Sequence, residues 1–115
     1  IDFVVTPVPK KRLKEYRALC RKSASIWKKY GAIAYAECLA DDVKPGKVTS
    51  FPQSVALKKN EVVGTAMITF KSKAHRAAVW KKAMKDPFMA NYDMKSAPFD
   101  AKRMFFGGFK PVVMF

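Results

Sequence analysis

Residues 10–30 carry an amphipathic pattern that limits the possible folds of this chain more than any other feature. At 100° per residue, a stripe about 80° wide collects one set of side chains: Leu13, Tyr16, Cys20, Ala24 and Trp27. Lysines and arginines fall on the opposite side. The pattern predicts a long helix with one buried and one solvated face. Gly31 is a typical C-terminal cap for it.

Segments rich in β-branched residues flank this helix and predict strands. The expected strands and extended stretches are residues 2–8, 33–40, 48–51, 53–59, 61–70 and 104–114. Gly64 indicates a bulge or a close backbone contact within its strand. Gly107 and Gly108 indicate a kink in the last strand.

A second, shorter helix is expected over residues 73–86. Ser72 is a suitable N-cap, and the Asp86-Pro87 step should end the helix. Residues 88–103 are expected to be irregular, with one helical turn near Asn91. No repeat or linker interrupts the 115 residues, so we expect a single domain.

The order strand, helix, strand, strands, helix, strand is the split βαβ pattern of ferredoxin-like folds. We therefore expect an α+β domain with both helices on one face of an antiparallel sheet. In residues 33–40, Tyr35 and Glu37 share one strand face, and small residues such as Ala36 and Cys38 share the other. We expect the helices to cover the small residues, with Cys20 and Cys38 buried as packing residues. The larger face would then meet a second copy of the chain, giving a homodimeric α/β barrel.

Composition excludes several classes of protein. Half of the residues are apolar, which argues against a disordered chain. No apolar run approaches the roughly 20 residues of a membrane span. Two cysteines without paired spacing form no zinc site, and no nucleotide or catalytic motif is present. We expect a cytoplasmic protein without metal or cofactor.

Three motifs make the chain resemble the YbaA-like family over nearly its whole length. They lie at residues 41–52, at residues 74–76 and at residues 98–104, the last followed by residues 107–111. The resemblance implies membership of the dimeric α/β-barrel superfamily, which includes cofactor-independent monooxygenases and haem-degrading enzymes. The family itself has no established activity. The resemblance thus predicts a barrel that binds a small, partly apolar molecule, with weak oxygenase or isomerase activity at most.

Glu37 and His75 are the candidate catalytic residues. Glu37 is a carboxylate expected in the barrel interior, where it must be paired, hydrogen-bonded or neutral. His75 is the single histidine, and a carboxylate partner would make it a general base. The structural alternatives are an ion pair of Glu37 with Arg103 or Lys102, and a surface position for His75 in its helix. The candidate ligand-binding residues are Tyr35, Met67, Arg103 and Phe106.

The positive charge is concentrated in the two helices. Residues 10–30 carry nine lysines and arginines against Glu15 alone, and residues 71–86 carry six against Asp86 alone. Together they hold +13 of the total +14. This leaves an alternative function, the binding of nucleic acid or another anionic surface. Its candidate contacts are Lys10, Lys11, Lys14, Arg21 and Lys28, and its structural alternative is a solubilising lysine coat.

Overall fold

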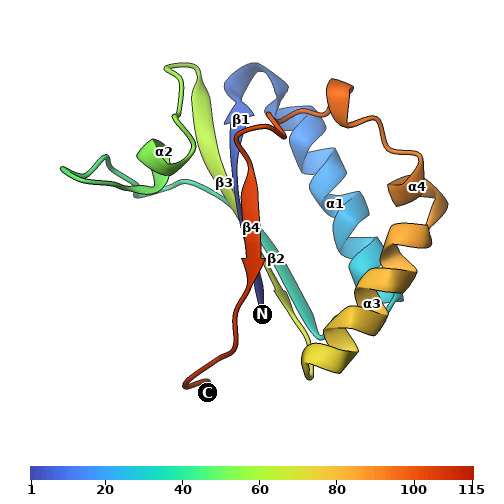
Figure 1. Cartoon of the computed structure of the whole chain (residues 1–115). Coiled ribbons are helices and arrows are strands. Elements are labelled where there is room, and N and C mark those ends of the chain that lie inside the picture. Colours follow the sequence, from blue (N-terminus) through green and yellow to red (C-terminus); the bar gives the residue numbers. More distant parts are fainter.

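Four strands form one antiparallel sheet, and the two main helices lie together on one side of it (Figure 1). The computed structural model describes residues 1–115. The strands are β1 (Asp2–Pro9), β2 (Ala34–Leu39), β3 (Glu61–Thr69) and β4 (Phe105–Gly108). The helices are α1 (Leu13–Lys29), α2 (Phe51–Ser54), α3 (Lys73–Lys85) and α4 (Pro87–Ala90), with 3₁₀ turns at Lys10–Arg12 and Met94–Ser96. The α+β prediction is confirmed.

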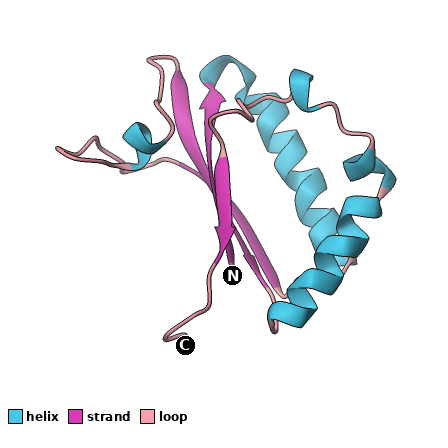
Figure 2. Cartoon of the chain, in the orientation of Figure 1, coloured by secondary structure: helices cyan, strands magenta, loops and turns pink.

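The sheet order is β2-β3-β1-β4, so β2 and β4 form its edges. In the register, Val4 lies opposite both Ala66 of β3 and Phe106 of β4, and Glu37 of β2 also lies opposite Ala66. Figure 2 shows α1, α3 and α4 on one side of the sheet and only the short α2 on the other. We call the side without α1 and α3 the open face.

The apolar stripe of α1 packs as its periodicity predicts. Trp27 of the stripe forms a buried cluster with Ile68 of β3, with Val79 and Ala83 of α3, and with Ile26, which lies outside the predicted stripe. Tyr16, further up the stripe, is also buried. The helix starts at Leu13 rather than at residue 10, since the amide of Lys10 still donates to the carbonyl of Asn60 and extends the β1–β3 ladder.

Capping residues set the other helix ends. Gly31 has φ +109° after α1, which confirms its role as a C-terminal cap. The hydroxyl of Ser72 accepts from the amide of His75 at 3.1 Å, and α3 ends at Lys85. Asp86 then caps α4, accepting from the amide of Phe88 at 3.0 Å. The predicted caps at Ser72 and Asp86-Pro87 are therefore confirmed. None of the helices has both the length and the apolar character needed to cross a membrane.

Three expected extended stretches are wrong: residues 48–51 and 53–59 contain no strand, and the strand expected over residues 104–114 is shorter. Residues 51–54 form α2, because Ser50 caps its N-terminus: the amide of Gln53 donates to the Ser50 hydroxyl at 3.2 Å, and this hydroxyl donates to the Gln53 side chain at 2.6 Å. The last strand ends at Gly108 instead of residue 114. Gly108 pairs with Asp2, and the ladder continues for one more residue, since Phe109 and Ile1 exchange backbone hydrogen bonds at 2.7 and 2.8 Å.

The two faces of β2 are the reverse of the expectation. Tyr35 packs against the cluster around Trp27, so it and its alternate neighbour Glu37 face α1. Cys38, expected to be buried, is exposed. Cys20 of α1 is partly buried, as expected. Alternation correctly grouped the side chains, but alternation alone does not say which face a helix covers.

Candidate functional site

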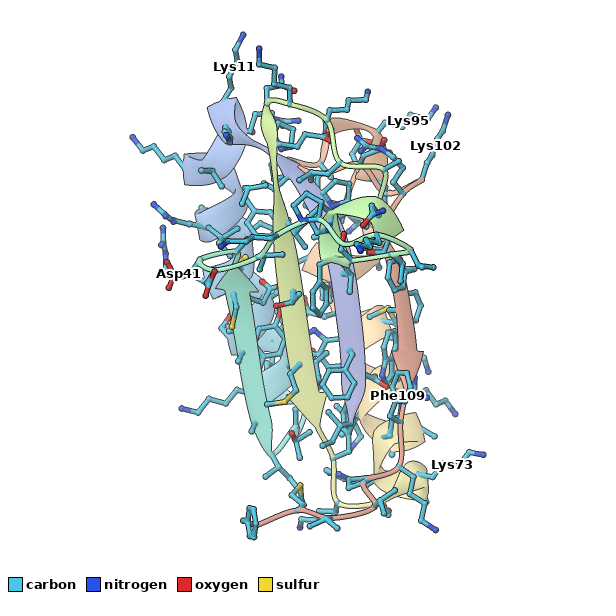
Figure 3. All side chains as sticks on the ribbon, turned by 90° about the vertical axis from the view of Figure 1, so that its left-hand side faces the viewer. Lys11, Asp41, Lys73, Lys95, Lys102 and Phe109 are labelled. Atoms are coloured by element: carbon cyan, nitrogen blue, oxygen red, sulfur yellow. The ribbon has the colours of Figure 1, made fainter.

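The open face of the sheet contains a groove of about 730 Å³. At one end, α2 covers the sheet through a cluster of Val5, Val55 and Val63. Beyond this cluster the groove is lined largely by apolar side chains, among them Phe3, Phe51, Phe105 and Phe109. Figure 3 looks onto this face, with Phe109 labelled just past the end of β4.

Five phenylalanines line the groove, since Phe106 also borders it, and all five are only half covered. Between 43% and 62% of each remains exposed, and the rings of Phe3 and Phe109 meet edge to face with centroids 5.5 Å apart. Lys110 is the one residue of the lining with an ionisable side chain. The groove can therefore contact an apolar body, but it offers no pair of side chains for acid–base catalysis.

Two of the predicted ligand-binding residues do not face the open side of the sheet. Phe106 stacks on Trp80 of α3 at 6.0 Å between ring centroids, on the helix-covered face, but it also borders the groove as predicted. Tyr35 lies under α1, as described above. Met67 lies opposite Phe3 in the β1–β3 register and thus shares the open face with it, but it does not line the groove.

Arg103 is occupied by structural partners. It donates to the two carboxylate oxygens of Glu61 at 2.8 and 2.5 Å and to Asp100 at 2.8 Å, and it also donates to the carbonyl of Val55 at 3.1 Å. This guanidinium lowers the pKa of both carboxylates. Arg103 therefore pairs with Glu61 and Asp100 rather than with Glu37, and the predicted pairing is wrong.

His75 lies at the start of α3, in the surface setting that was its structural alternative. Its Nδ1 accepts from the amide of Lys71 at 2.9 Å, and its ring meets the edge of Phe70 at 6.1 Å. It forms no ion pair with a carboxylate. It lines neither the groove nor the cavity that contains Glu37.

Glu37 borders a second, smaller cavity of about 260 Å³ between α1 and β2. Its lining is Tyr16, Arg17, Cys20, Arg21, Glu37, Cys38 and Leu39. Burial raises the pKa of Glu37, while polar interactions with Cys20 and Tyr35 partly oppose this. Burial and the neighbouring Glu37 raise the pKa of Cys20 to about 12, so its sulfur is a protonated thiol.

The five basic candidates for anion binding lie on the outer surface. Lys10, Lys11, Lys14, Arg21 and Lys28 are all exposed, and none of them takes part in an ion pair. Figure 3 shows Lys11 pointing away from the protein. The surface is available to a polyanion. The same exposure is expected of a solvated lysine coat, so it does not distinguish the two interpretations.

Fold and cavities together define a small α+β protein with one helix-covered sheet face and one open, apolar face. The chain belongs to the family described as "Protein of unknown function (DUF1428)", which matches residues 1–101. It is 40% identical over 113 residues to the "Uncharacterized protein YbaA" of Escherichia coli strain K12 and of Shigella flexneri. Each match covers 98% of this chain and 96% of the relative. The predicted YbaA-like family is thus confirmed.

Proposed function

We propose that a second copy of this chain packs sheet to sheet over the open face, and that the two sheets enclose a site for a small, partly apolar molecule. The groove with five half-exposed phenylalanines carries this proposal. Monomeric proteins rarely leave a continuous apolar surface of this kind in water. A second sheet would bury these rings, while the groove would leave room for a ligand between the copies.

The connectivity supports the assembly. Sheet order β2-β3-β1-β4, with α1 and α3 on the same face, fits the ferredoxin-like plan expected from the sequence. A single copy has an open sheet with two edges, so a barrel requires the second copy. The family resemblance points to the same arrangement.

The lining suggests the chemistry of the ligand. Aromatic rings favour an apolar or aromatic body, and Lys110 favours one acidic group at the rim of the groove. The groove supports binding more strongly than catalysis, because Glu37, His75 and Arg103 are absent from its lining. The weak oxygenase or isomerase activity stays a prediction.

Sedimentation and dye binding test this proposal together. At micromolar protein we expect about twice the 13.0 kDa mass of one chain. Phe105→Asp would place a charge in the interface and should give monomers. The matched control is Val48→Asp, which alters an exposed apolar residue outside the groove and should stay dimeric. The neutral dye Nile red should bind the native protein and the control, but not F105D. A folded monomeric wild type would refute the proposal.

Binding of nucleic acid is the second candidate, and the concentration of +13 in residues 10–30 and 71–86 is the observation that favours it. A gel-shift titration with generic RNA and DNA at two salt concentrations tests it. If the proposal is right, the wild type should bind nucleic acid at near-physiological salt. Replacing all five basic candidates by Gln should remove this binding without changing the oligomeric state. Binding only at low salt, or unaltered by the five substitutions, would argue for a lysine coat.

A further inference from the structure

Arg17 and Arg21 stand one helical turn apart on α1 at the cavity that contains Glu37. Both are exposed, and neither takes part in an ion pair. Side chains four residues apart on a helix are neighbours on its surface, so the two guanidiniums can converge on one group. An unpaired pair of arginines beside a cavity is suited to a carboxylate, because the planar fork matches its two oxygens.

Polar and apolar groups divide the rest of this cavity. Leu39 supplies an apolar wall, and Tyr16 supplies an aromatic ring with a phenolic hydroxyl. Glu37 and the thiol of Cys20 complete the polar side. At about 260 Å³, the cavity has room for a small ring with one substituent.

We propose that the cavity between α1 and β2 binds a small aromatic or aliphatic carboxylic acid, held by Arg17 and Arg21 beside the side chain of Glu37. The apolar body of the acid would contact Leu39 and the Tyr16 ring. This site lies on the helix-covered side of the sheet, opposite the groove. It does not rest on the function proposed for the groove and survives if that function fails.

The charges around the cavity favour an acid over an amine. Two guanidiniums outnumber the single carboxyl group of the lining. Burial also raises the pKa of Glu37, which makes this side chain a better donor and a poorer partner for a cation. From α1 it faces Tyr16, Cys20, Arg17 and Arg21, and from β2 it faces Tyr35. Its partner in the register on β3 is Ala66, which does not titrate.

Benzoate and benzylamine are matched probes, since they share a ring and carry opposite charges. Amide chemical shifts of the labelled protein should move on addition of benzoate, chiefly at residues 16–21 and 37–39, and should not move there with benzylamine. Replacing both Arg17 and Arg21 by Gln should weaken benzoate binding by about tenfold or more. The control is Lys81→Gln with Lys85→Gln, which removes the same charge from exposed positions of α3 and should change affinity less than about twofold.

The role of Glu37 has its own readout. Between about pH 5.5 and 8 benzoate stays ionised, so any pH dependence must come from the protein. An ionised Glu37 would repel the carboxylate of the ligand, so Glu37→Gln should bind benzoate at least as tightly as the wild type at pH 8 and should show no loss of affinity as the pH rises. The proposal is overturned if benzylamine binds here in preference to benzoate, if the α3 control weakens binding as much as the arginine pair does, or if folded E37Q no longer binds.

Discussion

Arg103 forms a bidentate ion pair with Glu61 through two parallel hydrogen bonds, from Nη1 to Oε1 at 2.8 Å and from Nη2 to Oε2 at 2.5 Å. The same guanidinium holds Asp100 through its Nε and the carbonyls of Val55 and Ala56 through Nη1. One side chain thereby ties the segment before β4 to the start of β3 and to the end of α2. Since α2 covers one end of the open face, this link also sets one boundary of the groove.

Arg103→Met should destabilise the protein strongly. The substitution keeps an apolar stem of similar length but leaves the carboxylate of Glu61, which is 8% exposed, without its bidentate partner. Removing one member of a buried ion pair costs about 3–5 kcal/mol, and partial exposure of Arg103 reduces this to about 2–3 kcal/mol. Urea unfolding at pH 7 measures the loss. Glu15→Gln weakens only an exposed ion pair with Arg12 and should change the free energy of unfolding far less.

Acid should destabilise the fold through the same cluster. Arg103 lowers the pKa of Glu61 and Asp100, so both carboxylates bind protons less readily in the folded chain than in the unfolded one. Their stabilisation is complete above the unfolded pKa of about 4 and is lost as the pH falls through the folded values. Urea midpoints from pH 7 to pH 2 should decline below about pH 4. The decline should be shallower in R103M, and an equal decline in both proteins would contradict this assignment.

Glu37 should behave in the opposite sense. Burial raises its pKa in the folded chain, so the folded state binds the proton more tightly and stability gains as the pH falls through that pKa. Above this pKa, burial of the ionised carboxylate destabilises the folded state, because the charge loses its hydration. A neutral amide at the same position avoids this penalty. Glu37→Gln should therefore raise the urea midpoint at pH 8, and the difference from wild type should disappear near pH 4. A variant less stable than wild type at pH 8 would show that ionised Glu37 is stabilising.

Local sequence signals predicted the helices well because periodicity and caps depend on near neighbours. The stripe from Tyr16 to Trp27 and the caps at Gly31 and Ser72 all involve contacts within a few residues. The sequence prediction misses the helix α2, although Ser50 and Gln53 have the spacing of a capping box, because Pro52 between residues 48–51 and 53–59 also fits a break between two extended stretches. A proline in the first turn is compatible with a helix, so this signal was available.

The candidate site was harder to predict, since it depends on which side of the sheet each strand face meets. Alternation grouped Tyr35 with Glu37 correctly, but only the packing of α1 places them on its side. The same alternation places Phe3 and Val5 on one strand face, and Phe105 and Gly107 on one strand face, and these residues do line the groove. The sequence around them does not indicate, however, that this is the face without helices. The partners of Arg103 are equally distant in sequence, apart from Asp100 three residues before it.

Trp80 should stabilise the folded protein through the hydrogen bond of its indole nitrogen as well as through the packing of its ring. The fully buried carboxylate of Asp2 accepts from Trp80 Nε1 at 2.7 Å and from Arg76 Nε at 2.6 Å. Trp80→Phe keeps an aromatic ring beside Trp27 but removes one of these two donors, at a cost of about 1–3 kcal/mol. Urea unfolding of W80F measures it. Asp2→Asn tests whether this hydrogen bond is the reason for the loss of stability. In the D2N background, W80F should cost less free energy of unfolding than in the wild type. An equal cost in both backgrounds would show that ring packing alone explains the effect of W80F.

A single methyl group added at Gly64 should test how closely α1 approaches β3. A Cβ built there would lie 2.9 Å from the Tyr16 hydroxyl oxygen, but 3.5 Å from Tyr16 Cζ and 3.4 Å from Thr6 Cγ2. Gly64→Ala therefore forces the buried ring of Tyr16 to shift, which should cost about 1–3 kcal/mol.

Tyr16→Phe removes the one atom in severe contact, so G64A should cost much less in the Y16F background. A double-mutant cycle in urea should show a coupling of about 1–2 kcal/mol between the two sites. If the two costs are simply additive, the close approach of α1 to β3 at Gly64 is not what excludes a side chain there.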